Sequence, residues 1–269
     1  MEISVSSEPA CTRCGDTLDT TCAPSVAASG KQAPNLCRAC RLAPPPFVKA
    51  VAYGPYQGKM RELIHAFKYH GLRSVAPRLG ELLAGILTQL APEAPSELLV
   101  VSIPLHRSKH ADRGFNQARL LASEAVAYLR KHPTALRLSL APSTLMRLRA
   151  TESQAGLTPR QRRLNVRGAF GVSDPAAVFG KHVLLIDDIL TTGATARAAA
   201  GALLQAGAES VWVATLARAR RTGFASEGFS AMTEDRAGEF PVDSQPKGND
   251  ALAVPLQQAI MNSQNQPSI

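Results

Sequence analysis

Residues 183–195 read Val-Leu-Leu-Ile-Asp-Asp-Ile-Leu-Thr-Thr-Gly-Ala-Thr, and this stretch decides the fold. Its first four residues form an apolar run typical of a buried strand in a parallel sheet, and the alanine-rich residues 196–206 favour a helix. The turn between them therefore lies at the carboxyl end of a strand and the amino end of a helix. Unpaired amides and the helix dipole favour an anion at such a place. The sequence predicts an α/β fold with a phosphate-binding turn.

The turn and the two acids before it together suit one class of ligand. Amides and hydroxyls of the turn would hold a phosphate, and the predicted binding residues are Thr191, Thr192, Gly193, Ala194 and Thr195. Asp187 and Asp188 would repel a bare anion, but carboxylates accept hydrogen bonds from a sugar diol, each contributing roughly 1.5–3 kcal/mol. We therefore expect a ribose 5-phosphate ligand, with its 2- and 3-hydroxyls on the two acids.

Three other interpretations of this stretch are possible. In an ordinary strand-to-helix turn, Asp187 and Asp188 would only cap the following helix. A Walker-type nucleotide loop fits less well, because no Gly-Lys-Ser/Thr closes the turn and the acids precede it. A dinucleotide-binding turn is disfavoured because Gly-x-Gly-x-x-Gly is absent from the stretch.

All five cysteines lie within the first 40 residues. Cys11 with Cys14 and Cys37 with Cys40 form two Cys-x-x-Cys pairs, which are typical of a tetrahedral thiolate zinc site. The 22 residues between the pairs slightly exceed the usual spacing of roughly 15–20 in a zinc ribbon. Disulfides and a redox dithiol are the alternatives, and the odd cysteine count disfavours disulfides. We expect a structural Zn²⁺ site, with Cys22 either replacing one ligand or standing outside it.

Composition and the position of a proline-rich segment predict the domain organisation. With 269 residues and 45% hydrophobic composition, the chain can bury one substantial core and a small appendage. The proline-rich residues 42–47 suggest a stiff connector. We expect a zinc ribbon in residues 1–42, an α/β domain in residues 48–220 and, because periodicity disappears beyond it, a disordered tail in residues 221–269.

The net charge of +9 suits phosphate-rich ligands, although many protein surfaces are simply basic. The tail has the opposite balance, since residues 222–269 hold six acids and two bases. No apolar run reaches the roughly 18 residues of a membrane-spanning helix, and the first residues do not resemble a secretory signal. We expect a cytoplasmic protein without a transmembrane segment.

A second predicted strand, residues 98–103, ends before a basic loop in residues 105–115. In an open α/β sheet, ligand-binding loops follow the carboxyl ends of strands, so this loop and the turn should open on one crevice. Its candidate binding residues are His106, Arg107, Lys109 and Arg113. A solvated surface loop is the alternative.

Residues 183–195 resemble the phosphoribosyl-pyrophosphate (PRPP) binding motif of type I phosphoribosyltransferases. Other segments are similar to the ComF family of competence-associated phosphoribosyltransferase-like proteins, which carry an N-terminal double-cysteine zinc ribbon. The resemblance covers about residues 9–218, and its most specific part outside the PRPP motif is Arg113-Gly-Phe-Asn-Gln-Ala118. Its remaining parts are residues 63–71, Ile103-Pro-Leu-His106, Gln154, residues 163–166 and Phe170.

The resemblance implies a type I phosphoribosyltransferase, Rossmann-like core preceded by zinc-binding structure. It also implies work in DNA uptake during natural competence, with a helicase-like translocase and single-strand-handling proteins as partners at the inner face of the membrane. On this interpretation Mg²⁺ accompanies PRPP, and Arg107, Lys109 or Arg113 neutralises the leaving pyrophosphate. Asp187, Asp188 and Arg113 are then the expected catalytic residues, with an acceptor that the sequence does not identify.

Three functions remain in competition. The first is a transferase that displaces pyrophosphate from PRPP, and the second is a module that binds PRPP or supports protein contacts without turnover. The third is contact with single-stranded DNA by the ribbon and the basic loops, whose mark would be binding that weakens steeply with salt. The first is our leading expectation, with a non-catalytic DNA-uptake accessory as the alternative.

Overall fold

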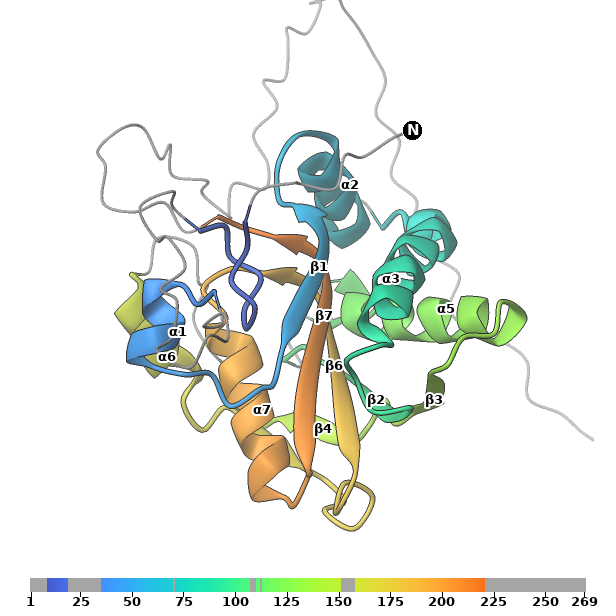
Figure 1. The fold of residues 1–269 in the computed structure, drawn as a ribbon. Helices are drawn as coiled ribbons and strands as arrows, with labels where there is room; N and C mark the ends of the chain where they lie inside the picture. Colours follow the sequence, from blue (N-terminus) through green and yellow to red (C-terminus); the bar gives the residue numbers. More distant parts are fainter. Residues whose placement is uncertain are drawn as a thin grey trace, which may run out of the picture. The chain divides into compact units, whose positions relative to one another are not determined.

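The computed structural model describes residues 9–18, 35–69, 71–106, 110–111, 113–150 and 158–220 (Figure 1). Within this part, five parallel strands form a sheet in the order β1-β7-β6-β2-β3. Their bounds are Ala50–Pro55 (β1), Glu97–Ser102 (β2), Arg137–Leu140 (β3), His182–Leu190 (β6) and Ser210–Arg218 (β7). The sheet is parallel because each strand returns through a helical crossover, as the alternation of apolar runs and helical segments predicts.

One face of the sheet is covered by helices with large apolar side chains (Figure 1). These helices are α2 (Gly58–Tyr69), α3 (Ala76–Leu90, preceded by the 3₁₀ turn Arg73–Val75) and α5 (Gln117–Lys131). Successive residues of a strand point to opposite faces, so Leu184 and Ile186 of β6 pack on this side. Their neighbours Val183 and Leu185 pack on the other side, against α7 (Ala194–Gln205).

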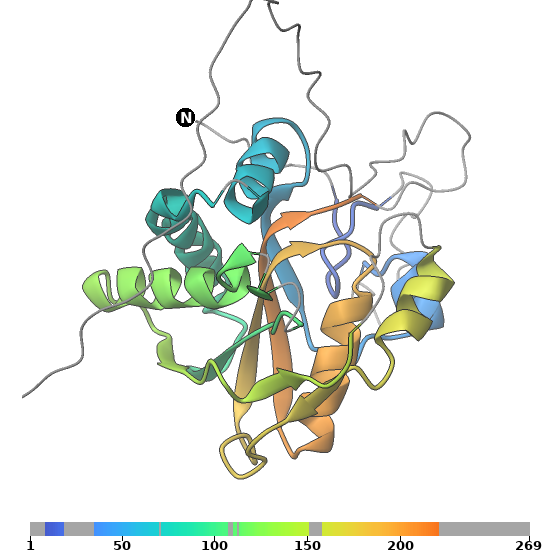
Figure 2. The ribbon, with the colours of Figure 1, turned by 180° about the vertical axis from the view of Figure 1, so that it is seen from behind.

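The two cysteine-containing stretches, residues 9–18 and 35–42, pack beside α7 on that second face (Figures 1 and 2). The second stretch ends in the short helix α1 (Arg38–Leu42). The backbone amide of Ala50, at the start of β1, donates to the carbonyl of Arg13 at 2.8 Å, and Phe47 is buried with the cysteines. The domain limits at residues 42 and 48 stay a prediction, but the cysteine stretches and the sheet share one apolar core.

A second, two-stranded sheet pairs β4 (Leu145–Arg147) with β5 (Phe170–Val172) in antiparallel fashion. The segment joining these strands contains α6 (Pro159–Val166). The helix forms because Thr158 and Gln161 make a capping box: the Thr158 hydroxyl accepts from the Gln161 amide, and the Gln161 side chain accepts from the Thr158 amide.

The expected end of the central strand at Ile186 is wrong. Strand β6 continues to Leu190 because β7 pairs with it throughout, from His182↔Ser210 to Leu190↔Arg218. Asp187 and Asp188 therefore lie within the strand, and α7 begins two residues earlier than expected. Across the described residues, no helix combines the length and apolar character that crossing a membrane requires.

Candidate functional site

The last residues of β6 lie at a topological switch point of the sheet. Strand β6 leads through α7 to β7 on one side, whereas its neighbour β2 leads through α5 to β3 on the other side and over the opposite face. Pairing between β2 and β6 ends at Ser102↔Ile186, so residues 187–190 extend beyond β2. The connections diverge at this point, and a crevice at the carboxyl ends of the strands is where open α/β folds bind ligands.

Asp188 is a buried carboxylate whose partner comes from α2. Lys68 Nζ lies 3.1 Å from Asp188 Oδ2, and both side chains are largely shielded from solvent. Burial lowers the pKa of Lys68, but the carboxylates of Asp188 and Asp187 more than offset this, so its pKa lies above the usual value. Lys68 therefore stays protonated and provides the acid pair with a fixed positive charge.

Asp187 is half-buried, and the environment of its carboxyl differs from that of Asp188. Its Oδ1 accepts a hydrogen bond of 2.9 Å from the amide of Asp188. Burial, and then repulsion from Asp188, raise the pKa of Asp187 to about 7, although Lys68 and Arg147 of β4 act in the opposite direction. Asp187 can therefore change its protonation state near neutral pH.

The turn that follows β6 leads into α7 through a glycine. Gly193 takes a left-handed conformation with φ 75°, which glycine adopts without strain, and it occupies the N-cap position of α7 without a side chain to cap the helix. The Thr192 hydroxyl accepts from the amide of Ala194 at 3.4 Å. The first backbone bond of the helix runs from Arg197 N to Gly193 O at 2.9 Å, so the amides of the first turn point outward from the helix end.

Arg113 reaches the same end of α2 as the ion pair. Its guanidinium lies over the Tyr69 ring, 4.8 Å from the ring centroid, and donates to the Tyr69 hydroxyl at 3.2 Å. Tyr69 directly follows Lys68, so Arg113 and the Lys68–Asp188 ion pair both contact the final turn of α2. His106 is half-buried at the start of the loop, whereas Arg107 and Lys109 lie outside the described residues.

The rest of the segment Arg113–Ala118 holds the loop in place. Asn116 caps α5 by accepting from the amide of Arg119 at 3.1 Å, and its side-chain amide donates to the Ile103 carbonyl at 3.0 Å. It thereby joins the end of β2 to the start of α5. Phe115 is buried against Phe67 of α2, with ring centroids 5.4 Å apart. Most of this segment is thus structural, and Arg113 is its candidate ligand contact.

Three cations of the site were missed by sequence reasoning. Lys68 lies within residues 63–71, which resemble the ComF family, so the sequence contains a signal for it. Arg147 has no comparable sequence signal. It lies in β4, and its charge acts on Asp187 because the pairing of β4 with β5 positions it near that residue. Arg218 also has none, since it ends an apolar strand 30 residues beyond Asp188 and is 6% exposed.

The expected metal ligands form one buried cluster. The Sγ atoms of Cys11, Cys14, Cys37 and Cys40 all lie within 4.8 Å of one another, and none of the four is disulfide-bonded. Cys14 Sγ and Cys37 Sγ are 3.7 Å apart. A tetrahedral ion with Zn–S bonds of about 2.3 Å places its sulfurs about 3.8 Å apart, so this donor set fits zinc. Cys22 lies outside the described residues.

Crowding of these thiols also favours a cation. Hydrogen bonding to Cys11 raises the pKa of Cys14 to about 11, and hydrogen bonds to Cys11 and Cys14 raise that of Cys40 above its usual range. Four buried thiolates cannot accumulate without a compensating positive charge, which a divalent ion supplies. The cluster could therefore hold a metal ion such as zinc.

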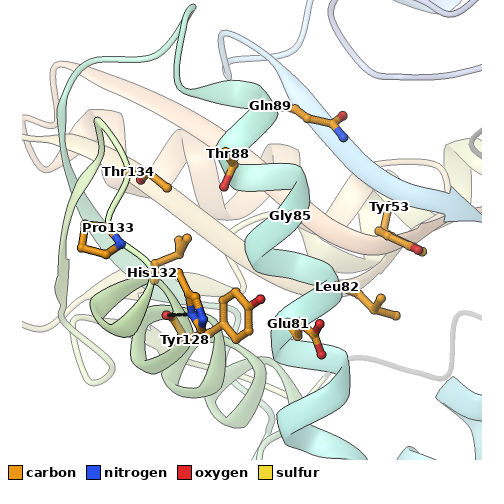
Figure 3. Close-up of a pocket in the computed structure, with 11 residues that line it drawn as sticks. Tyr53, Glu81, Leu82, Gly85, Thr88, Gln89, Tyr128, His132, Pro133 and Thr134 are labelled. Carbon is orange, nitrogen blue, oxygen red and sulfur yellow. Dashed lines mark hydrogen bonds between the residues drawn. The ribbon is translucent and has the colours of Figure 1, made fainter.

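A separate open pocket of about 580 Å³ lies between α3 and α5 (Figure 3). It is lined by Tyr53 of β1, by residues of α3 such as Glu81 and Thr88, and by the end of α5 and the residues after it, such as Tyr128 and His132. Its lining residues include neither Asp187 and Asp188 nor the turn that follows β6.

The phosphoribosyl transferase domain family matches residues 116–244. The DNA utilization protein YhgH of Escherichia coli O157:H7 is 32% identical over 212 residues, which are 77% of this chain and 88% of the relative. Competence protein F of Haemophilus influenzae is 30% identical over 191 residues, 68% of this chain and 78% of that protein. A crystal structure of a hypoxanthine phosphoribosyltransferase from Staphylococcus aureus aligns with 54% of this chain and 64% of its own, at 17% identity and a TM-score of 0.34.

Proposed function

Because this chain belongs to the ComF family of phosphoribosyltransferase-like competence proteins, we propose that it binds PRPP with Mg²⁺ in the crevice between β2 and β6. One observation carries the proposal. An acid pair extends past the neighbouring strand at the switch point and is followed directly by a helix start with a glycine at its N-cap. Few ligands other than a ribose 5-phosphate need both features.

Each part of the proposed site has a separate task. The amides and hydroxyls of residues 191–195 hold the 5-phosphate, and Asp187 and Asp188 accept hydrogen bonds from the ribose hydroxyls. Asp188 is already paired with Lys68, so the acids are a poor cage for a free divalent cation. We therefore expect that Mg²⁺ would enter with the ligand and would offset the charge of its pyrophosphate, while Asp187 and Asp188 contact the ribose.

Transfer would depend on charge placement more than on covalent chemistry by the protein. As the bond from C1 to pyrophosphate lengthens, positive charge develops on the ribose and negative charge on the departing oxygens. The carboxylates beside the ribose stabilise the first, and the loop cations Arg113, Arg107 and Lys109 stabilise the second. An acceptor nucleophile then takes the phosphoribosyl group at C1 and pyrophosphate leaves.

Calorimetric titration with PRPP and Mg²⁺ tests this function. The paired substitution of Asp187→Asn and Asp188→Asn keeps the volume of both side chains and should weaken PRPP affinity at least tenfold, while affinity for inorganic phosphate should not fall, because two repelling charges are removed. Glu81→Gln, in the separate pocket between α3 and α5, is the matched control for loss of an acid. Unchanged PRPP affinity in the double variant would overturn our placement of the diol.

Release of pyrophosphate then separates the transferase from a binding module. Acceptor screens with a pyrophosphate readout should show release that depends on Asp187 and Asp188. Binding without release for every acceptor class would favour the alternative, a non-catalytic accessory that senses a phosphorylated metabolite.

We also propose a place in DNA uptake, which the printed names of the relatives support: "DNA utilization protein" and "Competence protein F". The basic loop that contains Arg107, Lys109 and Arg113 would then serve DNA phosphates as well as PRPP. Fluorescence anisotropy with a labelled single strand at increasing salt tests direct contact, and Arg113→Ala should reduce both the affinity and its salt dependence. If Arg113→Ala leaves both unchanged, DNA contact by this loop is excluded, and the DNA-related role would operate through protein partners.

A further inference from the structure

The cysteine cluster and the phosphate turn are joined by a buried arginine. One terminal nitrogen of Arg218, Nη1, donates to the Leu190 carbonyl at 2.8 Å and to the Thr191 carbonyl. The other, Nη2, lies 3.3 Å from Asp16 Oδ2 and donates to Cys14 Sγ at 3.9 Å. A single guanidinium thus contacts the first cysteine pair and the residues that begin the turn.

A second arginine joins the other cysteine pair to the other end of the turn. Arg197 lies in the first turn of α7, just beyond Gly193, and its two terminal nitrogens donate to the carbonyls of Ala43 and Pro44 at 2.6 and 3.1 Å. Ala43 directly follows α1, which carries Cys40. Each cysteine pair is therefore connected through one arginine to one end of the phosphate turn.

The contacts of Arg218 also orient the amides that would bind an anion. In a planar trans peptide, the C=O and the following N–H point in opposite directions. Since the carbonyls of Leu190 and Thr191 point to Arg218 on the β7 side, the amides of Thr191 and Thr192 point away from it, towards the side of the crevice. The left-handed Gly193 then continues the backbone into α7.

From these contacts we infer that Arg218 and Arg197 are positioning residues through which the metal-organised cysteine pairs hold the phosphate turn in its binding conformation. Zinc fixes the relative positions of the two pairs, and the two guanidiniums transmit those positions to residues 190–193 and 197. This inference rests on the proposed function for the identity of the ligand. The coupling itself is a property of the protein and can be measured without any ligand.

Hydrogen exchange in the zinc-loaded full chain, followed by mass spectrometry, tests the coupling directly. Arg218→Lys keeps a buried cation but loses the paired geometry, and it should increase exchange of the amides in residues 190–195 at least tenfold. Asp16→Asn removes the charge partner from the cysteine side without touching a metal ligand or the turn, and should increase the same exchange about threefold. Arg130→Ala, an exposed arginine near the end of α5, is the control and should change nothing.

Zinc content and PRPP affinity complete the experiment. All compared proteins should hold one zinc per chain, and PRPP affinity should fall in the order Arg130→Ala, Asp16→Asn, Arg218→Lys. If Arg218→Lys fails to fold, the half-buried Arg197 offers Arg197→Ala, with an expected threefold effect on exchange and affinity. Exchange of residues 190–195 within twofold of wild type in both Asp16→Asn and Arg197→Ala would overturn the inference. Absence of PRPP binding by the wild type would instead overturn the proposed function and leave the exchange result valid.

Discussion

The two faces of the central sheet are covered in different ways. On one face, α3 and α5 bury long side chains such as Leu79, Leu83 and Leu121 against the sheet. On the other face, α7 contributes mainly alanines, and the cysteine stretches share the remaining cover with Leu145, Phe170 and Val178. The first face is stabilised by ordinary hydrophobic packing, whereas the second depends on segments that contain few apolar residues. The candidate site touches both, through Lys68 on the first face and Arg218 on the second.

The largest expected effect falls on the second face. Cys40→Ser removes a ligand that is 1% exposed and with it most of a metal-binding free energy of roughly 10–16 kcal/mol. We expect zinc to fall to less than about a tenth of the wild-type content, and exchange to rise in residues 9–18, 35–50 and 194–205, while α3 and α5 stay protected. Metal analysis with hydrogen exchange measures both. Cys22→Ser is the control and should keep its zinc; full zinc content in Cys40→Ser would disprove the four-cysteine site.

The stability of the face covered by α3 and α5 should depend on side-chain volume and not on metal binding. A Cβ added at Gly80 of α3 would lie 2.4 Å from Glu124 Cβ and 2.9 Å from the Glu124 carbonyl carbon. Gly80→Ala must push α3 from α5 and should cost about 1–3 kcal/mol in the free energy of unfolding, with zinc content unchanged. Gly85→Ala, in the same helix but facing open space, should stabilise by about 0.5–1 kcal/mol. Urea unfolding measures both, and equal effects would contradict the close crossing.

A smaller effect is expected at Asp187, between the two faces. Its pKa is raised from 3.8 to about 7, so between these values the native state holds a proton that the unfolded chain releases. Stability should therefore fall as pH rises from about 4 to 7. Asp187→Asn should remove this fall and stabilise the protein by about 1–2 kcal/mol at pH 8.

The same substitution also tests whether Asp187 binds the ligand, as the proposed function requires. Asp187→Asn should weaken PRPP binding while it raises the melting temperature at pH 8, which distinguishes a ligand-binding acid from a structural one. Thermal unfolding at pH 5 and pH 8 beside calorimetric titration gives both readings. A variant that loses stability at pH 8 would show that Asp187 is instead a structural ion-pair partner.

The smallest effect on stability is expected at the edge strand β3, away from the helices and cysteine stretches that cover the two faces. Arg137 of β3 pairs with Glu97 of β2 at 2.7 Å, but both side chains are more than two-thirds exposed. Solvent screens such a pair, so Arg137→Ala should change the free energy of unfolding by less than about 0.5 kcal/mol. Urea unfolding in low and high salt checks this, and a loss above 1 kcal/mol would show that β3 depends on the pair.

Local sequence signals predicted the parallel α/β core and the cysteine cluster, because apolar runs, helix formers and paired cysteines act over short distances. They also brought Asp187, Asp188 and the turn of residues 191–195 to one place. The cations were not predictable in this way: Arg147 and Arg218 reach the site only through strand pairing and close packing. The length of β6 was misjudged for a related reason, since its partner β7 and not its own polarity decides where pairing ends.

The packing of residues 9–18 and 35–47 against α7 and β7 has a consequence for biosynthesis. The cysteine stretches emerge from the ribosome long before residues 194–218, which form the surface that they cover. During translation, the cysteines could bind a metal ion early. The apolar residues of the cysteine stretches can pack only after α7 and β7 have been synthesised. We therefore expect the early segment to complete its packing only after β7 has formed, because Arg218 of β7 contacts Asp16.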